Sequence, residues 1–136
     1  MQMGADGAVN GATQDVARTV LELTGGRGVD VVIENVGAAV WGAALKSLVR
    51  GGRLVTCGAT SGDQPGADLR RMFIRQLKVF GSTLGTLAEF ADLLALCERL
   101  PMRPVIDSRY PLDAVAQALA RLESGAQFGK VALAID

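Results

Sequence analysis

Short apolar runs alternate with helix-like segments along most of this chain, and this alternation limits the possible folds more than any other feature. Three runs, Val29–Ile33, Leu54–Cys57 and Lys78–Thr83, are rich in the β-branched and apolar residues that strands favour. The first run is apolar at nearly every position, as expected of a strand covered on both faces of a parallel sheet. Because helices separate the runs, right-handed βαβ units are favoured. The sequence therefore predicts an α/β fold with an open parallel sheet.

Capping residues and glycines predict where the intervening helices begin and end. Thr13 is expected to cap a first helix, and Asp68 a helix that precedes the third strand. A helix between the first two strands should end at Gly51, where glycine supplies the left-handed stop. Thr86 and Glu89 have the spacing of a capping box, which predicts a further helix from this point.

The pattern changes near residue 101. Beyond it, residues 104–110 suggest an extended segment, residues 115–122 a helix and residues 130–135 a final strand. We therefore place a domain boundary near residue 101, which separates residues 1–100 from residues 101–136.

The charge balance argues against two classes of partner. Fourteen basic residues match fourteen acidic ones, so the chain has no overall field that would gather nucleic acid or anionic lipid. No apolar run approaches the roughly 20 residues that a membrane helix needs, and the first residues lack the basic region and apolar stretch typical of a signal peptide. We expect a cytoplasmic protein that binds neither nucleic acid nor membrane.

The residues that most often carry chemistry are scarce. The chain has no histidine, which removes the commonest metal ligand and the usual general base near neutral pH. The two cysteines, Cys57 and Cys97, lie far apart in apolar contexts, so each is interpreted as a small buried apolar residue. Arg70, Arg71 and Arg75 could form a phosphate clamp, but a solvated helix face or salt bridges are favoured. We predict neither catalytic nor metal-ligating residues in this chain.

Small residues follow each of the three apolar runs, at positions 35–37, 58–62 and 82–85. In open α/β sheets, ligands bind at the carboxyl ends of the strands. Glycines there let a flat ring approach the backbone closely. The alternative is that glycine follows a strand because turns need it. From the residues alone, the chain is an α/β domain with a predicted ligand-binding edge.

Four sequence fragments carry a family resemblance: Thr24–Val32, Gly51–Val55, Gly81–Gly85 and Phe128–Val131. Their order and spacing resemble those of the medium-chain dehydrogenase/reductase superfamily, and the resemblance extends from about Gly4 to Ile135. Branches of the superfamily include zinc-binding alcohol dehydrogenases and quinone oxidoreductases. The resemblance implies that residues 1–100 are the C-terminal half of a Rossmann-like nucleotide-binding domain, with the last strands of a doubly wound sheet. Residues 101–136 would be the C-terminal segment that returns to the catalytic domain.

The resemblance also implies nine residues that contact a nicotinamide cofactor, NAD or NADP. Asn35 and Val36 would lie on the adenine side of the cofactor. Cys57, Gly58 and Ala59 would lie beside the nicotinamide, and Ser82, Thr83 and Leu84 at its carboxamide. Lys130 would bind the pyrophosphate. For Lys130 the alternative is a solvated lysine at the start of a strand, because exposed lysines are common.

The chain departs from the family pattern in ways that bear on activity. It contains no GxGxxG motif to cradle a pyrophosphate. It also lacks the residue that, in a complete Rossmann domain, follows the second strand and chooses between NAD and NADP. Zinc is compatible with the parent protein, but this chain supplies no ligands for it. We expect a fragment of an NAD(P)(H)-dependent oxidoreductase acting on alcohols, aldehydes, ketones or quinones, inactive in isolation. The alternative is a non-catalytic nucleotide-binding or dimerisation module.

A sheet that contains only the later strands should be prone to self-association. The candidate strand around Val9 would lack its usual neighbour, and the strand at Val29–Ile33 would lie at an open edge. The family resemblance further implies pairing of residues 78–83 across a two-fold axis. We therefore predict a homodimer through this strand.

Overall fold

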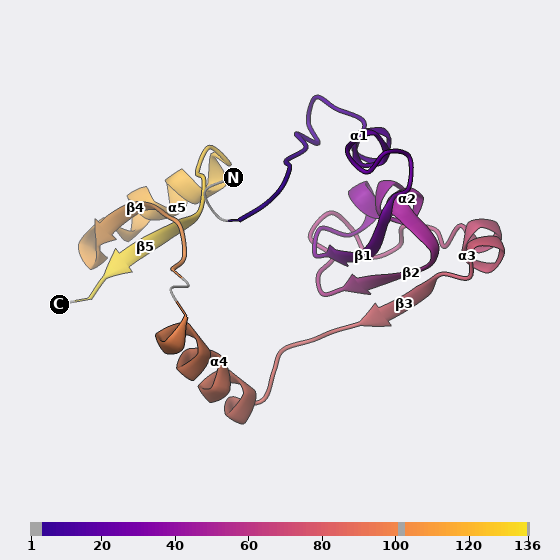
Figure 1. Cartoon of the computed structure of the whole chain (residues 1–136). Helices are drawn as coiled ribbons and strands as arrows, with labels where there is room; N and C mark the ends of the chain where they lie inside the picture. The colour runs from indigo at the N-terminus through magenta and orange to yellow at the C-terminus, as the bar shows by residue number, and fades with distance from the viewer. Residues whose placement is uncertain (1–3, 101–102, 136) are drawn as a thin grey trace. The chain divides into compact units, whose positions relative to one another are not determined.

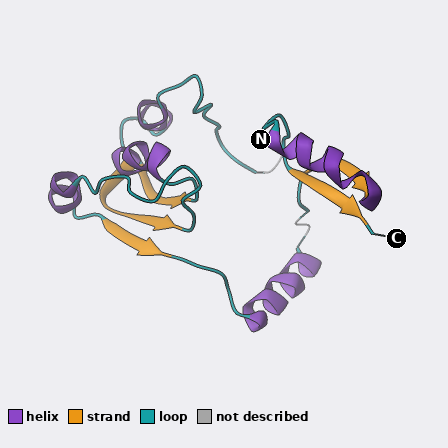
Figure 2. Ribbon diagram, turned by 180° about the vertical axis from the view of Figure 1, so that it is seen from behind, coloured by secondary structure: helices purple, strands orange, loops and turns teal. Residues whose placement is uncertain are grey.

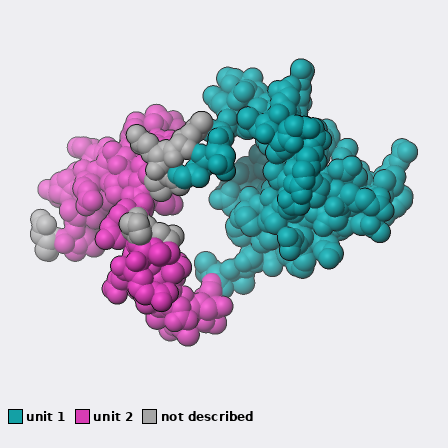
Figure 3. Space-filling model, in the orientation of Figure 1, with its two compact units in different colours: residues 1–84 teal, residues 85–136 magenta. Residues whose placement is uncertain are grey.

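The computed structural model describes residues 4–100 and 103–135. The chain divides after Leu84 into two compact units (Figure 3). The first unit contains α1 (Val16–Leu23), β1 (Val29–Glu34), α2 (Ala38–Ser47), β2 (Leu48–Thr56), α3 (Leu69–Arg75) and β3 (Lys78–Gly81). The second contains α4 (Leu87–Arg99), β4 (Ile106–Pro111), a 3₁₀ turn (Leu112–Ala114), α5 (Val115–Glu123) and β5 (Lys130–Ala134) (Figure 1).

The first unit is built on a parallel sheet in the order β1-β2-β3 (Figure 2). Leu54 in the middle strand pairs with Val32 on one side and with Val79 on the other. All three strands therefore end at the same edge of the sheet. The predicted α/β class with a parallel sheet is confirmed.

The core of the first unit lies between α2 and the sheet. Leu45, Leu48 and Leu54 are almost fully buried, and Val32 and Trp41 pack against them. This arrangement follows from the helical spacing of the apolar residues in α2 and from the apolar run in β2.

Only one face of β1 is covered within the described residues. Val32 lies in the core, whereas the side chains of Val31 and Ile33 on the opposite face are exposed, Ile33 by 68%. The prediction that this strand is covered on both faces is therefore wrong for the described part of the chain, because α2 packs on a single side of it. The prediction that it lies at an edge of the sheet is confirmed.

The first helix begins two residues later than predicted. Asp15, rather than Thr13, accepts a hydrogen bond at the N-terminus of α1. At the other end, Gly25 takes the left-handed conformation with φ of 61°, and the N–H of Gly26 donates to the carbonyl of Leu21 at 2.7 Å. This is a Schellman ending, which the glycine pair predicted.

The boundary between α2 and β2 also differs from the prediction. The helix ends at Ser47 and the strand begins at Leu48, so Gly51 lies inside β2 instead of ending the helix. The strand accommodates it because the register shifts here: Val29 pairs with Leu48, but Val31 pairs with Arg53. Gly51 has φ of 74°, a conformation that favours glycine.

Two other predicted capping sites are confirmed. The side chain of Asp68 accepts from the N–H of Arg71 at the start of α3. At α4, the N–H of Thr86 donates to Glu89 at 2.7 Å and the N–H of Glu89 donates to the Thr86 hydroxyl at 3.2 Å, a complete capping box. The candidate strand at Ala8–Asn10 is not a strand.

In the second unit, β4 and β5 pair in parallel and α5 packs on both of them. The division between compact units falls after Leu84, whereas the predicted domain boundary near residue 101 lies outside the described residues. The assignment of residues 1–100 and 101–136 to different domains of a larger protein stays a prediction.

Candidate functional site

Backbone hydrogen bonds continue from strand to strand just beyond the ends of the sheet. The N–H of Cys57 donates to the carbonyl of Glu34, and the N–H of Ser82 donates to the carbonyl of Thr56, both at 2.9 Å. We call residues 34–37, 56–62 and 81–84 the strand-end edge. Eight of the nine predicted cofactor-contacting residues lie on it.

A buried carboxylate that the sequence did not single out organises this edge. Glu34 is 3% exposed, and its Oε1 accepts hydrogen bonds from the N–H of Val36 and, at 2.6 Å, from that of Gly37. Its Oε2 accepts from the Thr56 hydroxyl at 3.3 Å. The side chain thus fixes the turn after β1 and links it to β2. The only signal in the sequence is an acidic residue directly after an apolar run.

Two glycines of the edge are required by contact between its loops. A Cβ added to Gly37, which has φ of 96°, would lie 2.5 Å from the carbonyl oxygen of Gly62. One added to Gly58 would lie 2.5 Å from the carbonyl oxygen of Asn35. Gly81, by contrast, has nothing within 4 Å of the added atom. Loop packing therefore explains the small residue at Gly37 and Gly58, while Gly81 faces open space.

The loop after β2 also satisfies the N-terminus of α2. The hydroxyl of Ser61 donates to the carbonyl of Val36 at 2.7 Å and accepts from the N–H of Ala39 at 3.0 Å. The N–H of Ala38 donates to the carbonyl of Gly62 at 2.9 Å. These bonds occupy the donors that a free helix N-terminus would offer to an anion.

The predicted residues of the edge line two different cavities. Gly58 and Ala59 lie in the wall of a cavity of about 400 Å³, together with Glu34, Trp41 and residues 62, 63 and 65–67 of the loop. Asn35 and Val36 line a cavity of about 210 Å³ with apolar residues of α1, β1 and α2. The residues predicted to contact the two ends of a dinucleotide thus line two separate cavities of the same unit.

Cys57 is exposed, which corrects the prediction of a buried residue. The apolar run continues to this position, but β2 ends at Thr56 and the chain leaves the sheet there. Cys97, predicted to be buried on α4, is half-buried.

The remaining predicted residues are exposed in their own units. Ser82, Thr83 and Leu84 are exposed where the chain leaves β3. Lys130 belongs to the second unit, where it is exposed at the start of β5 and its N–H donates to the carbonyl of Val105 at 2.8 Å.

Comparison with known proteins identifies the family. Residues 3–133 match the family model described as zinc-binding dehydrogenase. The chain belongs to this family. Its membership confirms the resemblance to medium-chain dehydrogenases/reductases and agrees with a partial Rossmann-like sheet.

The relatives of this zinc-binding dehydrogenase chain are considerably longer than the chain itself. The quinone oxidoreductase of Pseudomonas aeruginosa is 33% identical over 97% of this chain and 43% of that protein. The crotonyl-CoA reductase of Streptomyces collinus is 28% identical over 84% of this chain and 26% of that protein. A crystal structure of an NAD-dependent alcohol dehydrogenase superposes with a TM-score of 0.86 and 34% identity, covering 99% of this chain and 39% of that one. The chain thus spans less than half of each.

The zinc that the family description implies does not fit the donors of the described residues. Among residues 4–100 and 103–135, no group of three or more His, Cys, Asp or Glu side chains could hold a metal ion. The two cysteines lie in different units, and the sequence has no histidine.

None of the helices within residues 4–100 and 103–135 has the length and apolar character of a membrane span.

Proposed function

We propose that this chain is the C-terminal part of the cofactor-binding region of an NAD(P)-dependent oxidoreductase that acts on alcohols, aldehydes, ketones or quinones. Support comes from its family and from relatives named quinone oxidoreductase, alcohol dehydrogenase and crotonyl-CoA reductase. These names describe reactions in which a hydride is exchanged with a small carbonyl compound, alcohol, quinone or enoyl thioester.

One observation carries the proposal for this chain's own residues: the cavity of about 400 Å³ at the strand-end edge. Open α/β sheets bind ligands beyond the carboxyl ends of their strands. The cavity lies at such an end, and its volume falls within the roughly 300–1,000 Å³ of small-molecule sites. Its wall contains Gly58 and Ala59, two of the residues expected beside a nicotinamide ring, so the residues present fit that group.

The chain's own residues would bind and orient the cofactor, which supplies or accepts hydride when bound. Gly58 and Ala59 would place the backbone against the ring plane, and residues 82–84 would hydrogen-bond to the carboxamide through their main chain. Residues 35 and 36 would lie on the adenine side, and the Lys130 ammonium would bind the pyrophosphate.

An amide-resolved NMR titration of the chain with two half-ligands tests this division of the site. Nicotinamide mononucleotide should shift the amide signals of residues 57–59 and 82–84, and adenosine should shift those of residues 35 and 36. Ala59→Leu, which narrows the cavity, should weaken the first set of shifts and leave the second unchanged. Gly42→Ala, at a position with open space on α2, serves as the matched control and should alter neither. The proposal is wrong if neither ligand at millimolar concentration moves signals of the strand-end edge.

We also propose that the chain alone has negligible catalytic activity, since it contains no GxGxxG motif to cradle the pyrophosphate. Steady-state assays with NADH or NADPH and a quinone, or with NAD or NADP and an alcohol, should give no enzyme-dependent rate. Turnover proportional to the concentration of the purified chain would contradict this.

A further inference from the structure

The chain has two asparagines, and only one of them precedes a glycine. Asn10 is followed by Gly11, and Asn35 is followed by Val36. The side-chain amide of asparagine is an electrophile, because the main-chain nitrogen of the next residue can attack its carbon and close a cyclic imide. Glycine leaves that nitrogen uncrowded, whereas a β-branched residue shields it. The local sequence therefore favours this reaction at Asn10 and opposes it at Asn35.

The structure leaves the side chain of Asn10 open to attack. The segment that precedes α1, indigo in Figure 1, contains Asn10 as an exposed residue. Its Oδ1 accepts a hydrogen bond from the N–H of Ala12 at 3.0 Å, which makes an Asx turn. The turn closes a ring that includes the nitrogen of Gly11, and its hydrogen bond polarises the amide carbonyl. The electrophile is therefore held beside the attacking nitrogen and activated.

The attacking nitrogens differ more than the two asparagines do. The N–H of Gly11 has no acceptor among residues 4–100 and 103–135. The N–H of Val36 instead donates to the buried carboxylate of Glu34. Removing the proton of Val36 would place a negative charge beside that carboxylate, which opposes the attack. Because both asparagines are exposed, the state of the next nitrogen distinguishes them.

We propose that Asn10 is a site of spontaneous deamidation. The Gly11 nitrogen forms a bond to Cγ of Asn10 and loses its proton, and the side-chain nitrogen leaves as ammonia. Water then adds to one of the two carbonyl carbons of the imide, and the bond from that carbon to the Gly11 nitrogen breaks. Attack at Cγ gives aspartate, and attack at the former main-chain carbonyl gives isoaspartate. One water is consumed and one ammonia is released, with no oxidation or reduction.

The two products change the segment before α1 in different ways. Both add a negative charge to a chain whose acidic and basic residues balance. In aspartate, a carboxylate oxygen can still accept the N–H of Ala12. In isoaspartate, the main chain runs through Cγ and is one carbon longer. The turn in which the carbonyl of Asn10 accepts the N–H groups of Thr13 and Gln14, at 3.1 and 2.9 Å, then no longer closes.

Incubation of the purified 136-residue chain in mildly alkaline buffer, followed by tryptic peptide mapping, tests the proposal. Trypsin cleaves after Arg18 and Arg27, so the two asparagines fall in different peptides. The first peptide should gain about 1 Da as –NH₂ is replaced by –OH, and fragment ions should place the gain at residue 10. The peptide that contains Asn35 should keep its mass.

Gly11→Ala is the decisive variant, because the structure accommodates it. Gly11 does not have a positive φ, and a Cβ added there would lie 3.4 Å from Cγ2 of Val16, an ordinary contact. The variant should fold like the unmodified chain and deamidate several-fold more slowly, since the new methyl group crowds the nitrogen. Gly42→Ala, at a position with open space on α2, is the matched control and should deamidate at the unchanged rate.

The same chain unfolded in guanidinium chloride separates the effect of the fold from that of the sequence. Asn10 should react at least as fast in the folded chain as in the unfolded one. Asn35 should react more slowly in the folded chain, where the N–H of Val36 is bound to Glu34. Protection of Asn10 by folding, or equal rates in Gly11→Ala and the unmodified chain, would overturn the proposal. Reaction of Asn35 as fast as Asn10 in the folded chain would overturn it as well, because the two nitrogens would then be equivalent.

Discussion

At the scale of single residues, the strand-end edge depends on glycines that allow two loops to touch. Gly58 packs against the carbonyl of Asn35, and Gly37 packs against the loop that ends at Gly62. A side chain at either position would push apart loops that share hydrogen bonds with Ser61 and with the start of α2. The shape of the 400 Å³ cavity therefore rests on backbone contact as well as on its lining side chains.

Gly58→Ala should destabilise the first unit by about 1–3 kcal/mol, because the new methyl group overpacks against rigid backbone. Gly81→Ala is the control at the end of the neighbouring strand, where the added atom has open space, and it should change stability by less than about 0.5 kcal/mol. Urea unfolding followed by the fluorescence of Trp41, the chain's single tryptophan, reports on this unit. Equal effects of the two substitutions would contradict the close approach at Gly58.

Local sequence predicted the strand ends that form the candidate site, but not the side chain that organises them. The small residues after each apolar run correctly marked the edge, because strand ends and turns leave local signals. Glu34 was missed, since its burial depends on two amides of the following turn and on Thr56 in a strand 22 residues away. Cys57 was predicted to be buried because its apolar run does not show that pairing with β3 ends one residue earlier.

At the scale of elements, arginines join α3 to the sheet. Arg75 of α3 donates to the carbonyl of Leu48 in β2, and Arg50 of β2 donates to the carbonyl of Ile74 in α3, each at 2.9 Å. Arg71 pairs with Asp68, the residue that caps the same helix. The salt bridge that the sequence favoured over a phosphate clamp is present for Arg71, whereas Arg75 hydrogen-bonds to a backbone carbonyl instead.

The beginnings and ends of elements were predictable where their signals are local. The capping box of α4 and the glycine ending of α1 needed only residues within one or two turns. The start of β2 was not, because the helix stripe reaches Leu48 and the register shift opposite β1 exists only in the assembled sheet. The cap at Asp15 was missed since Thr13 is an equally acceptable capping residue by type.

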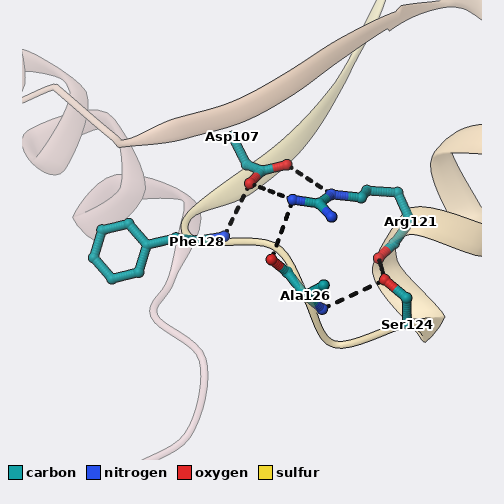
Figure 4. Close-up of polar contacts among 5 residues, drawn as sticks. All are labelled: Asp107, Arg121, Ser124, Ala126 and Phe128. Carbon is teal, nitrogen blue, oxygen red and sulfur yellow. Dashed lines mark hydrogen bonds and ion pairs between the residues drawn. The ribbon is translucent and has the colours of Figure 1, made fainter.

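The ion pair between Asp107 of β4 and Arg121 of α5 predicts how the stability of the second unit depends on pH (Figure 4). The Arg121 Nε and Nη2 donate to the two carboxylate oxygens of Asp107 at 3.0 and 2.9 Å. Because the folded-state pKa of Asp107 is depressed, its contribution is complete above the unfolded-state value of about 3.9 and is lost as pH falls through the folded value. Stability should be flat from neutral pH to about pH 4 and should decline below it. Urea unfolding followed by amide signals of residues 106–134 measures this.

In Asp107→Asn the acid decline should be smaller, because the group that must be protonated is gone. Asp30→Asn, which alters only an ion pair of the first unit, should keep the full decline in the second. A decline of the same size in Asp107→Asn and in the unmodified chain would show that other carboxylates cause it.

At the scale of the whole molecule, large apolar side chains remain exposed in both units. They include Ile33 of β1, Phe80 of β3, and Phe90 and Leu93 of α4. Exposed apolar groups of this kind mark surfaces that bind other protein.

The α/β class and the parallel order of the strands were predictable because strand and helix patterns are local, whereas the packing of helices on only one face of β1 was not. That packing depends on which elements are present to pack on each face.

Self-association is the remaining prediction at this scale, and it distinguishes two strand edges. In sedimentation equilibrium, the weight-average mass should rise with concentration above the 14.2 kDa of one chain. Phe80→Lys places a charge on β3, an outer strand of the sheet, where lysine opposes pairing with a second copy, and it should lower the mass toward that of one chain. Ile33→Lys places the same charge on β1, the opposite outer strand, and should have the smaller effect if the dimer forms through residues 78–83. A larger effect of Ile33→Lys would instead assign association to the β1 side, where the apolar side chain is 68% exposed. A mass of one chain at every concentration would refute the dimer, and the apolar residues of β3 would then need another partner to explain them.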